Sequence, residues 1–143
     1  MNLKSVLFAG VALLAAGPAL AEITIEDAYL RTAGPTASNG AAFMVIHNTG
    51  EEDDRLIGAT SDIAAKVELH THMDMGNGVM QMTHVEEGFP IPAEGEHAME
   101  RGGDHVMLMG IGKELPEGAV VSVTLTFEHA GDITVEIPVD RSR

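Results

Sequence analysis

The stretch KVELHTHMDMGNGVMQMTHV, residues 66–85, decides how this sequence folds. Apolar and polar residues alternate on both sides of a central Asn77-Gly78 pair, and alternation with a period of two is typical of half-buried strands. Asn-Gly favours the tight turn between two antiparallel strands, because both residues tolerate positive φ angles. The stretch therefore predicts a β-hairpin.

The rest of the chain repeats this pattern of short strands divided by Gly, Pro and Asn turns. Strands are expected over residues 23–31, 41–47, 55–59, 105–111, 120–127 and 133–139. Residues 86–104 are rich in Gly, Pro and Glu and are expected to form a loop. After residue 21, no helical periodicity is found. Short strands at this spacing predict one all-β sandwich domain over residues 22–143.

The first 21 residues predict a signal peptide. Lys4 precedes an apolar run over residues 6–16, Pro18 breaks the run, and Ala19-Leu20-Ala21 forms a small-x-small cleavage site. The run is shorter than the ~20 apolar residues that span a bilayer. We expect cleavage after Ala21, a periplasmic product and no membrane insertion of the mature chain. A membrane anchor or a buried helix is the open alternative.

Charge and composition exclude several classes of protein. Removing residues 1–21 removes Lys4 and no acid, which leaves 7 basic and 22 acidic residues and a net charge of −15. Such a chain lacks the basic surface that binds nucleic acid or anionic lipid. It also has no cysteine, which excludes disulfides, thiolate zinc sites and the electron-transferring blue copper sites.

Imidazole and thioether side chains gather on single faces of three predicted strands. Alternation predicts one such face on each strand. The faces are Glu68, His70 and His72 on the first strand, Met80, Met82 and His84 on the second, and His105 and Met107 on the third. Thioether sulfur is soft and uncharged, so a His/Met site favours Cu(I) over Zn, Mg or Ca. Acidic residues 51–54 lack the alternating spacing of a calcium loop. His47, His97 and His129 are expected to be structural.

At these residues the chain resembles the PCu(A)C-type periplasmic copper chaperones. The signature of that family is a His, an optional Met, ten residues, a Met, about twenty-one residues and His-x-Met. Here it reads His70, Thr71, ten residues, Met82, twenty-two residues and His105-Val106-Met107. The second gap is one residue longer than usual. Further similarity lies in residues 27–31, 41–43, 47–50, 54–56, 67–70, 102–108 and 125–128.

The resemblance implies a cupredoxin-like (immunoglobulin-like) Greek-key β-sandwich that is not an enzyme. It implies one Cu(I) bound by His70, Met82, His105 and Met107. The implied role is delivery of copper to a respiratory oxidase subunit, directly or through another copper chaperone. Additional donors that offer weaker binding are His72, Met73, Met75, Met80 and His84.

The sequence disfavours an enzyme and leaves one other class of function open. An enzyme needs a nucleophile, a base and a pocket, and no triad or paired-carboxylate pattern is found in the sequence. A metal-free β-sandwich that serves as a binding module stays open as the alternative. Copper titration separates that module from a copper carrier.

Overall fold

The computed structural model describes residues 22–74 and 76–143. All secondary-structure elements assigned within these residues are β-strands. The strands are β1 (Ile23–Thr32), β2 (Asn39–Asn48), β3 (Asp54–Thr60), β4 (Ala64–Asp74), β5 (Met80–His84), β6 (Phe89–Ile91), β7 (Gly95–Met99), β8 (His105–Ile111), β9 (Val120–Phe127) and β10 (Gly131–Pro138). No helix in the described residues is long and apolar enough to cross a membrane. The predicted signal peptide, residues 1–21, lies outside the described residues.

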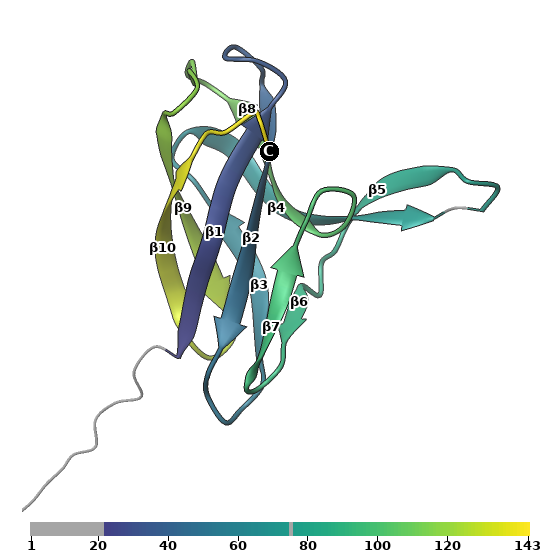
Figure 1. The fold of residues 1–143 in the computed structure, drawn as a ribbon, viewed down its shortest axis with the longest axis vertical. Coiled ribbons are helices and arrows are strands. Elements are labelled where there is room, and N and C mark those ends of the chain that lie inside the picture. The colour runs from purple at the N-terminus through teal and green to yellow at the C-terminus, as the bar shows by residue number, and fades with distance from the viewer. Residues whose placement is uncertain (1–21, 75) are drawn as a thin grey trace, which may run out of the picture.

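The strands form two antiparallel sheets that pack face to face (Figure 1). The larger sheet has the order β1-β2-β8-β4-β5, and β7 also pairs with β2. The smaller sheet has the order β10-β9-β3-β6. Successive strands change sheet repeatedly, so neighbouring strands come from distant parts of the sequence. The structure confirms the predicted all-β sandwich.

The core lies between the sheets and fixes which face each strand turns outward. Alternate residues of the central strands are fully buried, among them Ile46, Leu69, Val106, Leu108, Val123 and Leu125. Successive side chains of a strand point to opposite faces. Because Val106 and Leu108 fill the core, His105 and Met107 lie on the outer face of the larger sheet.

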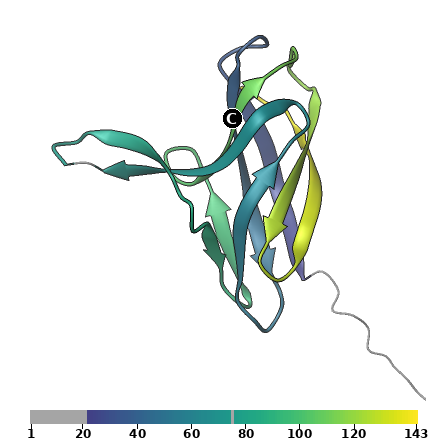
Figure 2. The same cartoon turned by 180° about the vertical axis from the view of Figure 1, so that it is seen from behind.

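The β4–β5 hairpin projects from the body of the sandwich (Figures 1 and 2). Its loop contains the Asn77-Gly78 pair, with φ angles of 55° and 77°. The amide of Val79 donates to the carbonyl of Gly76 at 3.0 Å and closes the turn. The predicted hairpin is confirmed, and β4 begins at Ala64, two residues before the stretch 66–85 that predicted it.

The expected loop over residues 86–104 is wrong, because it contains β6 and β7. Phe89 and Ile91 of β6 are buried, and Pro90 between them is exposed. β6 is an edge strand that pairs with β3, and an edge strand accommodates a proline that cannot donate a hydrogen bond. β7 is polar in composition and forms by pairing with β2, which local sequence does not reveal.

Candidate metal centre

The pairing of β4 with β8 brings the two predicted histidine ligands together. His70 lies directly opposite His105, and Glu68 lies directly opposite Met107. Residues that lie opposite each other in an antiparallel pair share a face, with Cβ atoms about 5 Å apart. Both pairs therefore lie on the outer face of the larger sheet.

The pairing of β4 with β5 extends this face toward the hairpin. His84 lies opposite His70, and Met82 lies opposite His72. Met82 keeps 39% of its surface exposed, whereas His105 keeps 1%. The structure thus assembles His70, His105 and Met107 on two adjacent strands, and it places Met82 one strand further out, at the exposed end. Predicted and additional donors form one continuous surface, the His/Met face: His70, His72, Met82, His84, His105 and Met107.

His105 presents an unpaired nitrogen to this face. Its Nδ1 donates to the carbonyl of Gly103 at 3.1 Å, so the lone pair of the neutral ring resides on Nε2. That Nε2 is buried and has no hydrogen-bond partner in the described residues. Burial lowers the pKa of His105, and the neighbouring His72 and His70 lower it further, while the hydrogen bond to Gly103 opposes them. His105 is therefore neutral at pH 7 and available as a ligand.

His70 has the same arrangement with the two nitrogens exchanged. Its Nε2 donates to Oε1 of Glu68 at 2.9 Å, and Nδ1 is buried without a partner among the described residues. Hydrogen bonds from His70 and Lys66 lower the pKa of Glu68 to about 2, which keeps it a carboxylate. A carboxylate that accepts from the outer nitrogen of a histidine fixes the ring and raises its basicity toward a metal.

The imidazole rings lie close enough for two of them to share one ion. The centroids of His70 and His105 are 5.8 Å apart. With about 2 Å between an imidazole nitrogen and a metal, two rings that ligate one ion have centroids roughly 5–6 Å apart. Phe43 covers His105 from β2, at a centroid distance of 5.9 Å, and excludes water from that side.

Methionine sulfur is a further type of donor on the His/Met face. In the described part of the chain, no three His, Cys, Asp or Glu side chains are arranged to hold a metal ion. Met107 and Met82 are thioethers on the same face as the two unpaired imidazole nitrogens. Soft sulfur with neutral imidazole selects Cu(I) among the biological metals.

Other donors named by the sequence lie elsewhere or serve other roles. Met73 lies on the opposite face of β4, paired with Gln81, and Met75 is outside the described residues. His47 pairs with Glu26 at 3.0 Å, and His129 lies 3.5 Å from Glu128.

Two contributors to the site were missed by sequence reasoning. The alternation over residues 67–72 placed Glu68 on the ligand face, but its role in orienting His70 depends on the distance between the two side chains. The carbonyl of Gly103 has no side-chain signal at all. His97 was expected to be structural, and it stacks on Phe89 at 5.1 Å.

The fold and this face together define a class of protein: small β-sandwich domains that display histidine and methionine on the outer face of one sheet. The family described as "Putative lipoprotein LpqE-like" matches residues 23–139, and the chain belongs to this family. It is 35% identical over 117 residues to "Putative lipoprotein Lxx21020" of Leifsonia xyli subsp. xyli, which covers 82% of this chain and 69% of that protein.

Solved structures of the same fold are PCuAC domains, which confirms the resemblance to the PCu(A)C family. The copper-bound PCuAC domain from PmoF2 is 28% identical with a TM-score of 0.69, and the match covers 86% of this chain and 96% of that one. The solution structure of CuI-DR1885 from Deinococcus radiodurans is 30% identical with a TM-score of 0.67, over 86% of this chain and 80% of that one.

The lowered pKa of His105 predicts how the stability of the metal-free protein depends on pH. Below about pH 6.5 the unfolded chain binds a proton at this position that the folded protein resists, so the free energy of unfolding decreases as pH falls from 6.5 through the folded pKa. Urea denaturation between pH 7.5 and 5 should show a smaller decrease for His105→Leu than for wild type. His129→Leu removes an exposed histidine and should keep the wild-type decrease. Equal decreases in all three proteins would contradict the assignment.

Proposed function

We propose that this protein is an exported copper chaperone that binds one Cu(I) through His70, Met82, His105 and Met107 and passes it on. The observation that carries the proposal is the pair of buried, unpartnered nitrogens, Nδ1 of His70 and Nε2 of His105. A buried polar atom without a partner costs about 1–3 kcal/mol. Two such atoms aimed from paired positions into one face, each on a ring held by its other nitrogen, are explained by an ion that binds both.

The chemistry of the donors supports Cu(I) as this ion. The chain has no cysteine, so thiolates cannot supply the soft ligands, and methionine sulfur takes that role. The similar PmoF2 domain is described as copper-bound, and the DR1885 structure is described with CuI. A His₂Met₂ set is uncharged, so the loaded site carries the single positive charge of the ion.

The position of the ligands suits a carrier rather than an enzyme. Met82 is 39% exposed in the middle of β5 of the projecting hairpin, whereas His105 is buried. An incoming donor can therefore replace Met82 first, while the imidazoles still hold the ion. Exchange of ligands one at a time lets copper leave without ever being free in solution.

Export and destination rest on the sequence and on its relatives. Residues 1–21 have the order of a signal peptide, and the matching family and the Leifsonia relative are both described as lipoproteins. We infer a periplasmic site of action. The recipient that the PCu(A)C resemblance implies is a respiratory oxidase subunit under assembly or another copper chaperone.

Replacing each methionine ligand by leucine tests the sulfur donors. Met82→Leu and Met107→Leu conserve volume, so the melting temperature without copper should stay close to wild type. Both variants should lose most of the rise in melting temperature that Cu(I) gives the wild type under reducing conditions. Met73→Leu, on the opposite face of the same hairpin, should keep this rise in full. Zinc binding tighter than Cu(I), or no Cu(I) binding by wild type, would contradict the proposal and favour a metal-free module.

Removing the carboxylate behind His70 tests the support of the ligand rather than the ligand itself. Glu68→Gln should weaken Cu(I) about 10- to 100-fold in competition with a chelator, because the ring loses its charged acceptor. Glu128→Gln, which changes the carboxylate beside the exposed His129, is the matched control and should leave the affinity unchanged. Equal affinities for the two variants would show that Glu68 does not support the site.

A further inference from the structure

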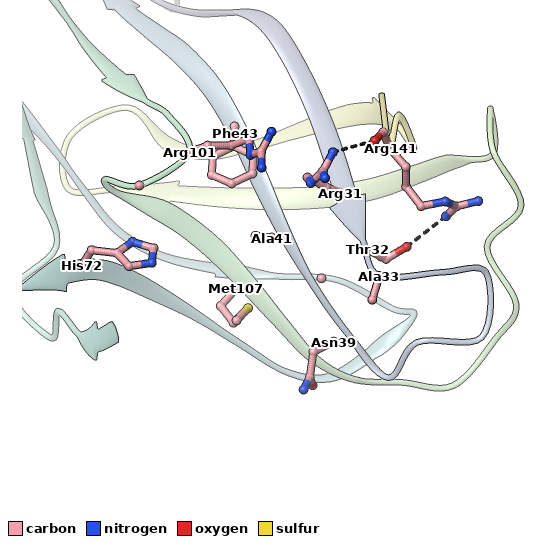
Figure 3. Close-up of a pocket in the computed structure, with 12 residues that line it drawn as sticks. Arg31, Thr32, Ala33, Asn39, Ala41, Phe43, His72, Arg101, Met107 and Arg141 are labelled. Carbon is pink, nitrogen blue, oxygen red and sulfur yellow. Dashed lines mark hydrogen bonds between the residues drawn. The ribbon is translucent and has the colours of Figure 1, made fainter. Parts of the chain in front are cut away.

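A cavity of about 570 Å³ opens beside the His/Met face. Met107 and His72 form part of its wall, so the cavity shares residues with the proposed copper site. Three arginines, Arg31, Arg101 and Arg141, line it as well (Figure 3). We call this cavity the arginine cleft.

The charge of the arginine cleft is opposite to that of the protein. The chain has 22 acidic residues and a net charge of −14, yet none of the described residues that line the cleft is acidic. Three of the five arginines in the whole sequence meet there. Arg31 and Arg141 are 110 positions apart, so the fold and not a local basic run creates this positive surface.

Arg141 holds the back of the cleft in place. Its Nη1 donates to Oγ1 of Thr32 at 2.9 Å and to the carbonyl of Leu115 at 3.1 Å, and its Nε lies 3.6 Å from Glu117. A guanidinium with this many protein partners is a fixed positive charge, and it shapes the cleft more than it binds.

Arg31 and Arg101 are the arginines of the cleft with unused N–H donors. Arg31 donates Nη1 to the main-chain oxygens of Arg141 and Arg143, both at 2.6 Å, and Arg101 donates Nη1 to that of Arg143 at 3.1 Å. No described carboxylate side chain lies within ion-pair distance of either residue. A guanidinium has five N–H donors, so most donors of Arg31 and Arg101 remain for an anion.

We propose that the arginine cleft docks an acidic segment of the protein that exchanges copper with this one. The inference rests on the proposed function for the identity of that partner. Arginine forks match carboxylates in bidentate geometry, and this cleft gathers three of the five arginines of an otherwise acidic chain. Because Met107 and His72 border the cleft, a docked segment brings the donors of its own protein to the edge of the His/Met face.

The same electrostatics make docking depend on cargo. Cu(I) bound by neutral side chains adds one positive charge next to the cleft, so the loaded protein attracts an acidic segment more strongly than the empty one. Transfer removes that charge and weakens the complex. Repulsion by the remaining acidic surface restricts productive encounters to this one approach.

Binding of labelled synthetic peptides to the copper-free protein tests the cleft directly. Hexaglutamate should bind at low ionic strength, measured by fluorescence anisotropy, and hexaglutamine of equal length should not. Arg101→Gln should weaken hexaglutamate about tenfold or more, in keeping with the loss of a hydrogen bond between charged groups. Arg31→Lys keeps the charge and should weaken it less than Arg31→Gln does. Arg55→Gln removes the same charge outside the cleft, where the side chain contacts the carbonyl of Glu87, and should have little effect.

Three results would overturn the docking proposal. They are absence of hexaglutamate binding, equal losses for Arg101→Gln and Arg55→Gln, and full displacement of the peptide by stoichiometric citrate, which would identify a small-anion site instead. Cu(I) stoichiometry is measured in parallel and should be unchanged in Arg101→Gln. A wild type that binds hexaglutamate but no Cu(I) would contradict the proposed function while the cleft still binds acidic segments, so the two failures are distinguishable.

Copper transfer supplies a second readout for the loaded protein. Two methionine-containing acceptor peptides are compared, identical except for a flank of three Glu or three Gln residues. Wild type should transfer Cu(I) faster to the acidic peptide, and Arg101→Gln should reduce this preference. Equal rates to both peptides from wild type would contradict docking at the cleft.

Discussion

The register between β4 and β8 is the constraint on which the candidate site depends. It sets His70 opposite His105 on the outer face, and it sets Leu69 opposite Val106 in the core. A slip of β4 by one residue would turn His70 into the apolar interior and expose Leu69, and the same slip of β8 would turn His105 inward and expose Val106 and Leu108; these three apolar residues are at most 2% exposed. The hydrophobic core thus fixes the register, and the register fixes the ligands. Strand pairing therefore places the two imidazoles opposite each other.

Hydrogen bonds to the outer nitrogens of His70 and His105 orient the two rings. Glu68 and the carbonyl of Gly103 each take one N–H of a ligand ring and leave the other nitrogen unpaired. Gly103 lies in the connection that leads from β7 to β8. There Nε2 of His97 lies 2.8 Å from Oδ2 of Asp104, an ion-pair contact whose angle falls outside hydrogen-bond geometry. His97 therefore contacts the segment that carries the acceptor of His105.

Local pattern predicted those parts of the molecule in which side-chain alternation is strict. β8 and β9 have the expected bounds, and the period of two correctly placed His105 and Met107 opposite Val106 and Leu108. β6 and β7 were not predicted, because Pro90 and Gly95 interrupt the alternation of side chains. Both strands form by pairing with distant strands, β6 with β3 and β7 with β2.

The sequence does not predict the arginine cleft for a related reason, since the residues of the cleft come from distant parts of the sequence and share no local motif. Likewise, the sequence could name His70 and His105 as candidate ligands, but it could not show which nitrogen of each ring is left without a partner. Distances and burial decide that, and they follow from tertiary structure.

The proposed site binds one copper ion through the two unpaired imidazole nitrogens and the two methionine sulfurs. X-ray absorption at the copper edge of the Cu(I)-loaded protein tests it most directly, with Met82→Leu and Met107→Leu measured beside wild type. We expect two sulfur and two imidazole scatterers in wild type and one sulfur fewer in each variant. A wild-type spectrum with nitrogen and oxygen scatterers alone, or sulfur scattering unchanged in both variants, would contradict it.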